Sequence, residues 1–194
     1  DLGNIYENHM IDNINYGYQN LVDGGLFDLI KEGLKKGHWI LIAIKKNIQD
    51  CNSRYLMLIS EGNDGSDIVK YLLSSLNRKY IELVGRKYKY DIKSGRYSEE
   101  ILNKIEYIME SDNVLILRDL DMIYASLYDL FNQNFAIMGD KKFARIAFEY
   151  AKISSEVNKD FHVIVLVNKN KIEDLKLDPP FLNRFEKHIV SFNM

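Results

Sequence analysis

An arginine near the end of the chain stands in the most specific pattern of the sequence. Arg184 lies within the segment Pro179-Pro-Phe-Leu-Asn-Arg-Phe185, just before a predicted strand, and apolar residues flank it. A guanidinium presents its donors in a rigid fork, so Arg184 could reach a phosphate or a carboxylate on a neighbour. It could equally form a salt bridge at the rim with Glu186 or with an upstream acid. The spacing alone leaves both interpretations open.

An aspartate follows the most apolar strand-like run of the chain. Asp119 comes directly after Val114-Leu-Ile-Leu-Arg118. A nucleotide hydrolase needs an aspartate at such a strand end to hold the hydration sphere of magnesium, and usually an adjacent glutamate to activate water. Asp119 falls one position late, and Leu120 stands where the glutamate would fall. Asp121 could serve instead, but its position favours the N-cap of a following helix.

The loop after the first predicted strand has the wrong charge for a phosphate site. It reads Ser60-Glu-Gly-Asn-Asp-Gly-Ser66. A phosphate loop would combine glycines with Gly-Lys-Ser/Thr, so that backbone amides and a lysine meet the phosphate charge. Here Glu61, Asp64 and Asp67 would repel a phosphate. We interpret the loop as a turn into a helix that Ser66 caps.

A polar side chain also ends the last long apolar run. Asn168 follows Val163-Ile-Val-Leu-Val167. An amide at this position can orient water or a terminal phosphate in a nucleotide-driven machine. It can equally cap the loop that follows, and the residues alone do not separate these two roles.

The elements that must position these residues alternate in type. Apolar runs of strand length and amphipathic runs of helical spacing follow one another, which predicts right-handed crossovers onto a parallel sheet with ligands at the carboxyl ends of its strands. Residues 142–156 could form a hairpin or an inserted helix. The predicted strands are 55–59, 80–84, 114–117, 161–167 and a last one ending at Val190. The predicted helices are 26–34, 66–76, 98–108, capped by Ser98, and a long one over 121–136. The run 39–44 could be a helix or a strand, and we favour the helix.

The composition excludes several classes of protein. The 194 residues are 46% hydrophobic with a formal net charge of −2, which predicts one folded domain and no electrostatic footprint for nucleic acid or an anionic membrane. The apolar run at residues 39–44 is too short to span a membrane. The single cysteine, Cys51, fits a reducing compartment, and the histidines lack metal-ligand spacing. We expect a soluble cytoplasmic domain, and the start at Asp1 suggests a piece of a longer protein.

The core from about Ser53 to Phe192 resembles the large subdomain of AAA+ ATPases. More narrowly, it is similar to a degenerate AAA unit of the mysterin-like giant RING-type ubiquitin ligases. The resemblance implies a three-layer α/β fold with a parallel sheet of P-loop NTPase-like topology over residues 53–194. It also implies a helical or irregular segment over residues 1–52, part of which looks like the lid of a preceding AAA unit. The motifs that carry it are Arg54–Leu58, Ile123–Asn132, Phe161–Val165 and above all Pro180–His188.

Carried over residue by residue, the resemblance makes Asp119 the nearest match to the Walker B aspartate. It makes Asn168 the match to the sensor residue and Arg184 the match to the arginine finger, which reaches nucleotide bound by a neighbouring subunit. The chain departs from the family pattern because it lacks the Walker A lysine and the Walker B glutamate. No catalytic residue or metal ligand is therefore assigned, and the resemblance implies a unit that neither hydrolyses ATP nor binds it tightly.

The function implied by this resemblance is that of a non-catalytic AAA unit. It would act in ring assembly and in coupling between units of an ATP-dependent ubiquitin ligase, with ATP and Mg²⁺ held by neighbouring units. Its partners would be the adjacent AAA units and, through the parent protein, the ubiquitination machinery, without nucleic acid. The alternatives are a diverged nucleotide-binding NTPase domain and a parallel-sheet protein-interaction domain.

Overall fold

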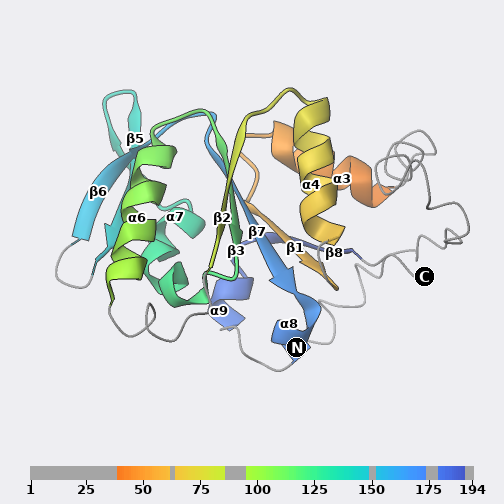
Figure 1. Ribbon diagram of the computed structural model, residues 1–194. Helices are drawn as coiled ribbons and strands as arrows, with labels where there is room; N and C mark the ends of the chain where they lie inside the picture. The colour runs from red at the N-terminus through yellow and green to blue at the C-terminus, as the bar shows by residue number, and fades with distance from the viewer. Residues whose placement is uncertain (1–38, 62–63, 86–94, 149–151, 174–178, 191–194) are drawn as a thin grey trace, which may run out of the picture.

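Five parallel strands form the centre of the molecule (Figure 1). The computed structural model describes residues 39–61, 64–85, 95–148, 152–173 and 179–190. Every pair of neighbouring strands runs parallel, and the order β2-β3-β7-β1-β8 requires crossover connections. The predicted strands are confirmed, with ends that differ by at most one residue. The strands are β1 (Leu56–Ser60), β2 (Tyr80–Val84), β3 (Val114–Arg118), β7 (His162–Asn168) and β8 (Glu186–Val190).

Helices cover both faces of this sheet. The helices α3 (Trp39–Gln49) and α4 (Asp64–Ser75) pack on one face, and α6 (Arg96–Met109) packs on the other (Figure 1). Alternate residues of β1 point to opposite faces: Leu56 and Leu58 join the α3 and α4 side, whereas Met57 belongs to the α6 side. The three-layer α/β architecture expected from the sequence is thereby confirmed.

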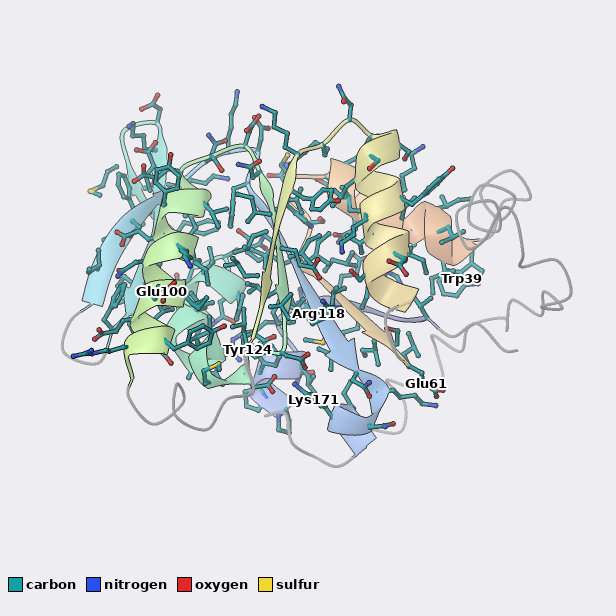
Figure 2. The ribbon with its side chains drawn as sticks, viewed as in Figure 1. Trp39, Glu61, Glu100, Arg118, Tyr124 and Lys171 are labelled. Atoms are coloured by element: carbon teal, nitrogen blue, oxygen red, sulfur yellow. The ribbon has the colours of Figure 1, made fainter. Side chains whose placement is uncertain are left out.

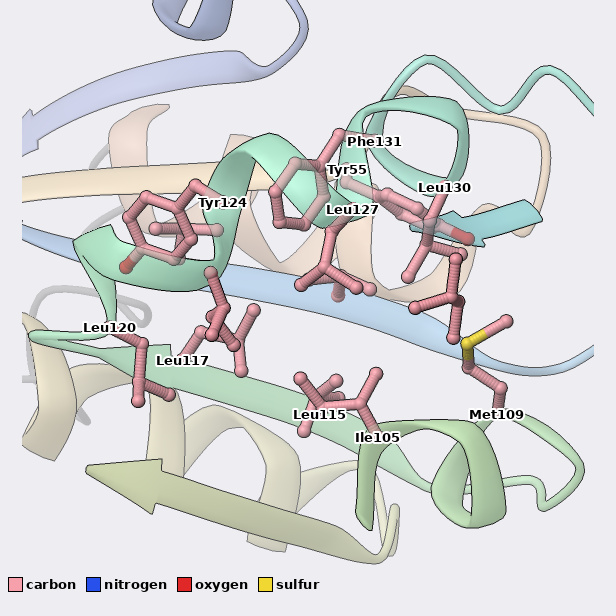
Figure 3. Packing of buried hydrophobic residues seen from close by; sticks show 14 of the residues in the cluster. Tyr55, Ile105, Met109, Leu115, Leu117, Leu120, Tyr124, Leu127, Leu130 and Phe131 are labelled. Atoms are coloured by element: carbon pink, nitrogen blue, oxygen red, sulfur yellow. The ribbon is translucent and has the colours of Figure 1, made fainter. Parts of the chain in front are cut away.

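The long helix predicted over residues 121–136 is wrong. The segment forms a 3₁₀-helix, η2 (Asp121–Leu127), then the short helix α7 (Tyr128–Phe131), and then β4 (Ala136–Met138). Residues three apart share a face in a 3₁₀-helix, so Tyr124 and Leu127 are both buried without a continuous α-helix. Figure 3 shows these side chains over Leu115 and Leu117 of β3. The positive φ of 53° at Gln133 lies beyond the end of α7.

The segment that the sequence left open is an antiparallel hairpin. The strand β5 (Lys141–Ala147) pairs with β6 (Lys152–Val157), and β4 pairs with β5 to complete a second, three-stranded sheet. This sheet stands beside α6 and α7 (Figure 1). The short helices α8 (Lys169–Glu173) and α9 (Pro179–Leu182) complete the described elements.

Three predicted helix caps are wrong. Ser66 and Ser98 lie inside α4 and α6, as the third residue of each helix. The N-cap of α6 is Gly95, with φ at 66° and no side-chain cap bond. Asp121 is the first residue of η2 instead of its cap, and no side chain caps that helix. Serine and aspartate are common both at caps and in first turns, so composition alone places a helix start only to within a turn.

The helix predicted over residues 39–44 is confirmed as α3, which extends to Gln49. Its buried residues Ile40, Leu41 and Ile44 belong to the same apolar cluster as Leu56 of β1. The helix predicted over residues 26–34 lies outside the described residues. A domain boundary between residues 52 and 53 stays a prediction, although α3 packs on the sheet itself.

Candidate functional site

The carboxyl ends of two neighbouring strands bring Asp119 and Asn168 to one edge of the sheet. Asp119 follows the last residue of β3, and Asn168 is the last residue of β7. These strands pair directly, with Arg118 opposite Leu166. Figure 2 shows Arg118, Lys171 and Glu61 on the lower side of the molecule, toward which the β7 arrow points. This is the edge at which parallel α/β sheets bind ligands.

A lysine of the chain itself occupies the space between the two candidate aspartates. Lys171 Nζ lies 3.0 Å from Asp119 Oδ1 and 2.5 Å from Asp121 Oδ2. Partial burial lowers the pKa of Lys171, but the hydrogen bonds and charges of Asp121 and Asp119 outweigh it, so the pKa is raised overall. The ammonium is therefore charged at neutral pH, and a metal ion at these oxygens would have to displace it.

Gly85, directly after the neighbouring strand β2, packs against the backbone of Asp119. Gly85, which follows β2, donates its N–H to Arg118 O at 2.8 Å. A Cβ atom built at Gly85 would lie 1.7 Å from the carbonyl oxygen of Asp119. Asp119 itself has a φ of 56°, in the left-handed region that aspartate tolerates better than most residues. The position of the Asp119 carboxylate thus depends on a glycine at residue 85.

The side chain of Asn168 caps the turn that carries Lys171. Its Oδ1 accepts a hydrogen bond from the backbone N–H of Asn170 at 2.9 Å, an arrangement typical of asparagine at the start of a turn. The sequence left two roles open for Asn168, and this hydrogen bond corresponds to the role of capping the following loop. Next to it, Lys169 Nζ lies 3.2 Å from Glu61 Oε1, which ties α8 to the loop after β1.

A second charged cluster lies between α4 and the sheet. Glu82 of β2 is 2.7 Å from Lys70 of α4 and 3.4 Å from Arg118 of β3. Ser66 Oγ is also within 3.5 Å of Glu82. Sequence reasoning missed Lys171, Glu82 and Lys70 because their roles depend on which elements become neighbours in space. The one available signal was the placement of Lys171 three residues after Asn168.

Arg184 lies away from this edge, at the amino ends of the strands. It precedes β8, whose first residue, Glu186, pairs with the first residue of β1 and donates its N–H to Tyr55 O. The Arg184 guanidinium lies 3.9 Å from the ring centroid of Tyr128, and its Nη1 donates to Pro180 O. Within the described part of the chain, Arg184 forms no ion pair, so the suggested bridge to Glu186 is not observed there.

Two negative findings apply to the described ranges only. No group of three or more His, Cys, Asp or Glu side chains is arranged there to hold a metal ion. In the same residues, no helix combines the length and the apolar character that crossing a membrane would require.

Comparisons with known proteins agree on one family. The family model described as "RNF213 AAA domain" matches residues 45–194. The E3 ubiquitin-protein ligase RNF213 of Mus musculus is 24% identical over 166 residues, and that of Homo sapiens is 25% identical over 146 residues. The matches cover 86% and 75% of this chain. The zebrafish (Danio rerio) protein rnf213-beta is 27% identical over 157 residues, or 77% of the chain.

The chain is short beside these relatives. Each match spans only 3% of the relative's length. Among solved structures, a crystal structure of the FIGL-1 AAA domain in complex with ADP is similar, with a TM-score of 0.48 and 12% identity. That similarity covers 99% of this chain and 62% of the FIGL-1 chain.

Proposed function

The chain belongs to the RNF213 AAA domain family, and from this premise we propose that it is a non-catalytic AAA unit of a larger ubiquitin ligase. Its role is to complete a ring of AAA units and to couple their movements. ATP and Mg²⁺ are held by other units, and the ubiquitination machinery is reached through the rest of the protein. The relatives carry the name of an E3 ubiquitin-protein ligase, which supports the assignment to such a protein.

The observation that carries the non-catalytic role is the ion pair of Lys171 with Asp119 and Asp121. In a hydrolytic AAA unit, the carboxylate at this strand end serves the hydrated magnesium of the nucleotide. Here a tethered ammonium neutralises it. Opening the site to Mg²⁺ would leave Lys171 partly buried beside a divalent cation, where like charges repel.

The loop after β1 supports the same conclusion. It offers Glu61 where a phosphate loop would offer positive charge, and Glu61 is paired with Lys169. The N–H of Gly65 donates to Ser60 Oγ at 3.3 Å, so this amide has an internal acceptor. A Cβ atom at Gly65 would lie 3.0 Å from that oxygen. The Oγ of Ser60 and the N–H of Gly65, on either side of the loop, are thus hydrogen-bonded to each other.

Arg184 is the residue that we assign to coupling between units. Its place at the amino ends of β1 and β8, away from Asp119, supports action on a neighbour's nucleotide instead of its own. The contact with the Tyr128 ring restrains the guanidinium, which reduces the entropy lost when it meets a phosphate. A cytoplasmic location is also proposed, and the exposed free thiol of Cys51 supports a reducing compartment.

The decisive experiment measures nucleotide binding and hydrolysis by the purified chain. We expect no ATP hydrolysis above that of buffer and no Mg²⁺-dependent rise in melting temperature with ATP. A magnesium-dependent rise would favour the alternative, a diverged nucleotide-binding domain. In that case Asp119→Asn should abolish the rise, whereas Asp112→Asn, a change at an exposed aspartate before β3, should leave it intact.

A further inference from the structure

Three cationic side chains converge on the carbonyl oxygens of one short segment, α9 and the residues after it. Arg184 donates to Pro180 O, Lys187 Nζ lies 3.1 Å from Leu182 O, and Arg54 Nη1 lies 3.4 Å from Asn183 O. They come from three places in the sequence: the end of α9, strand β8 and the residue pair before β1. The charge of Arg54 also lowers the pKa of Lys187, after burial as the larger cause, so these two cations lie close together.

No carboxylate in the described part of the chain pairs with any of these three cations. The nearest acid in sequence, Glu186, is turned to the other face of the sheet. There it accepts hydrogen bonds from Asn47 Nδ2 and His188 Nε2, both at 2.8 Å. Lys187 follows Glu186 on a strand and therefore points to the opposite face, toward α9. The neutral carbonyls leave most of the positive charge uncompensated.

The orientation of Arg184 leaves one of its nitrogen donors without a hydrogen bond in the described part of the chain. Its Nε is buried without a hydrogen-bond partner among the described residues, and its guanidinium carbon lies over the Tyr128 ring, 3.9 Å from the centroid. A buried unsatisfied donor is unfavourable and calls for an explanation. Arg184 Nη1 donates to Pro180 O, two residues before the Leu182 O that accepts from Lys187, so both cations face the same short segment.

We propose that Arg54 and Lys187 act with Arg184 as one three-cation site for the phosphate groups of a nucleotide presented by a neighbouring unit. This proposal rests on the proposed function of Arg184 and adds two phosphate-binding residues to it. Three positive charges gathered around one short segment are suited to a chain of phosphates, because such a chain carries several negative oxygens close together. A single finger would leave Arg54 and Lys187 without a role at this surface.

The test titrates the whole chain with two probes, inorganic tripolyphosphate and a tetraglutamate peptide. Binding is measured from the NMR chemical shifts of the backbone at several salt concentrations. We expect tripolyphosphate to shift the backbone signals of residues 180–187 and to bind more weakly at high salt. Arg54→Gln and Lys187→Gln should each weaken binding by about threefold or more, as expected for partly exposed charges. Lys159→Gln, a change at an exposed lysine of another loop, is the matched control and should not.

The outcomes separate this inference from the function on which it rests. Loss of binding in Arg184→Gln alone would overturn the three-cation site and leave Arg184 as a single finger. Tighter binding of tetraglutamate than of tripolyphosphate would overturn the phosphate assignment in favour of an acidic protein segment. Absence of tripolyphosphate binding, or equal loss in Lys159→Gln, would overturn the site. None of these results alters the ATP-hydrolysis test at the opposite end of the strands.

Discussion

The ammonium of Lys171 lies 3.0 Å from the carboxylate of Asp119, at the edge of the sheet where parallel α/β folds bind ligands. The two residues come from α8 and from the end of β3, and Asp121 of η2 completes the contact. The positive charge next to these two carboxylates is therefore supplied by a side chain of the polypeptide itself.

Replacing Lys171 should reveal how much this pair stabilises the fold. In Lys171→Met, Asp119 and Asp121 face each other without a counter-charge, and we expect the free energy of unfolding to fall by about 1 kcal/mol, since the pair is partly screened by water. Urea denaturation gives the value. In the double variant with Asp119→Asn the loss should be smaller than the sum of the single losses. Additive losses would show that the two side chains do not interact.

Gly85→Ala should be severely destabilising. The new methyl group would lie 1.7 Å from Asp119 O, a backbone atom that moves only with the end of β3. We expect a loss of more than about 3 kcal/mol, seen as a lower urea midpoint or as insoluble protein. Gly139→Ala is the matched control: φ is 64° but nothing lies within 4 Å of its Cβ position, so it should cost about 1 kcal/mol. Equal losses would contradict the close approach.

Stability should depend on pH through His162. Burial, followed by the charge of Arg78, lowers the pKa of His162 to about 4, although Glu186 and Asp50 raise it slightly. The unfolded chain, with a pKa near 6.5, binds more protons between these values. Stability is therefore lost as pH falls from about 6.5 to 4, by about 3 kcal/mol in total, and the loss levels off below pH 4.

The measurement for His162 compares urea midpoints between pH 7 and 4 in the wild type and in His162→Gln. Carboxylates titrate in both proteins, so the difference between the two curves isolates the histidine. The variant should lose its extra sensitivity in this range. Parallel curves would show that His162 is not held neutral by burial.

Among the polar residues of α3, Asn47 should lower the free energy of unfolding most when it is replaced. Its Nδ2 donates to Arg54 O at 2.9 Å and to Glu186 Oε2, and its Oδ1 lies 3.0 Å from Nε2 of His162. Asn47→Leu removes these three hydrogen bonds and takes the partner from the buried Nε2 of His162, and we expect a loss of about 3 kcal/mol. Asn52→Leu, in an exposed turn, should change the free energy of unfolding by less than about 0.5 kcal/mol. A similar small effect at residue 47 would exclude a stabilising network.

The sheet could be predicted from the sequence because its central strands β1, β3 and β7 are buried on both faces and so read as continuous apolar runs. Val114–Leu117 is the clearest example. The helix over 121–136 was wrong because the same apolar spacing also fits a 3₁₀-helix followed by a strand. The hairpin of β5 and β6 was one of two alternatives, since partly exposed strands alternate weakly.

Part of the candidate site could also be predicted. Asp119 and Asn168 were placed at strand ends because the apolar runs end there, and both lie at one edge. The pairing of Lys171 with Asp119 could not be predicted, because it depends on how α8 turns back after β7. The assignments of Asp119, Asn168 and Arg184 by resemblance stay predictions.

The hydrogen bond from Asn47 to Glu186 joins α3, the first described helix, to β8, the last described strand. Trp39 and His188 also meet edge to face, with ring centroids 6.4 Å apart. A mechanical pull applied through residues 39 and 190 would therefore load this junction first. The tension would pass across α3 and β8 while β2, β3 and β7 carry little of it.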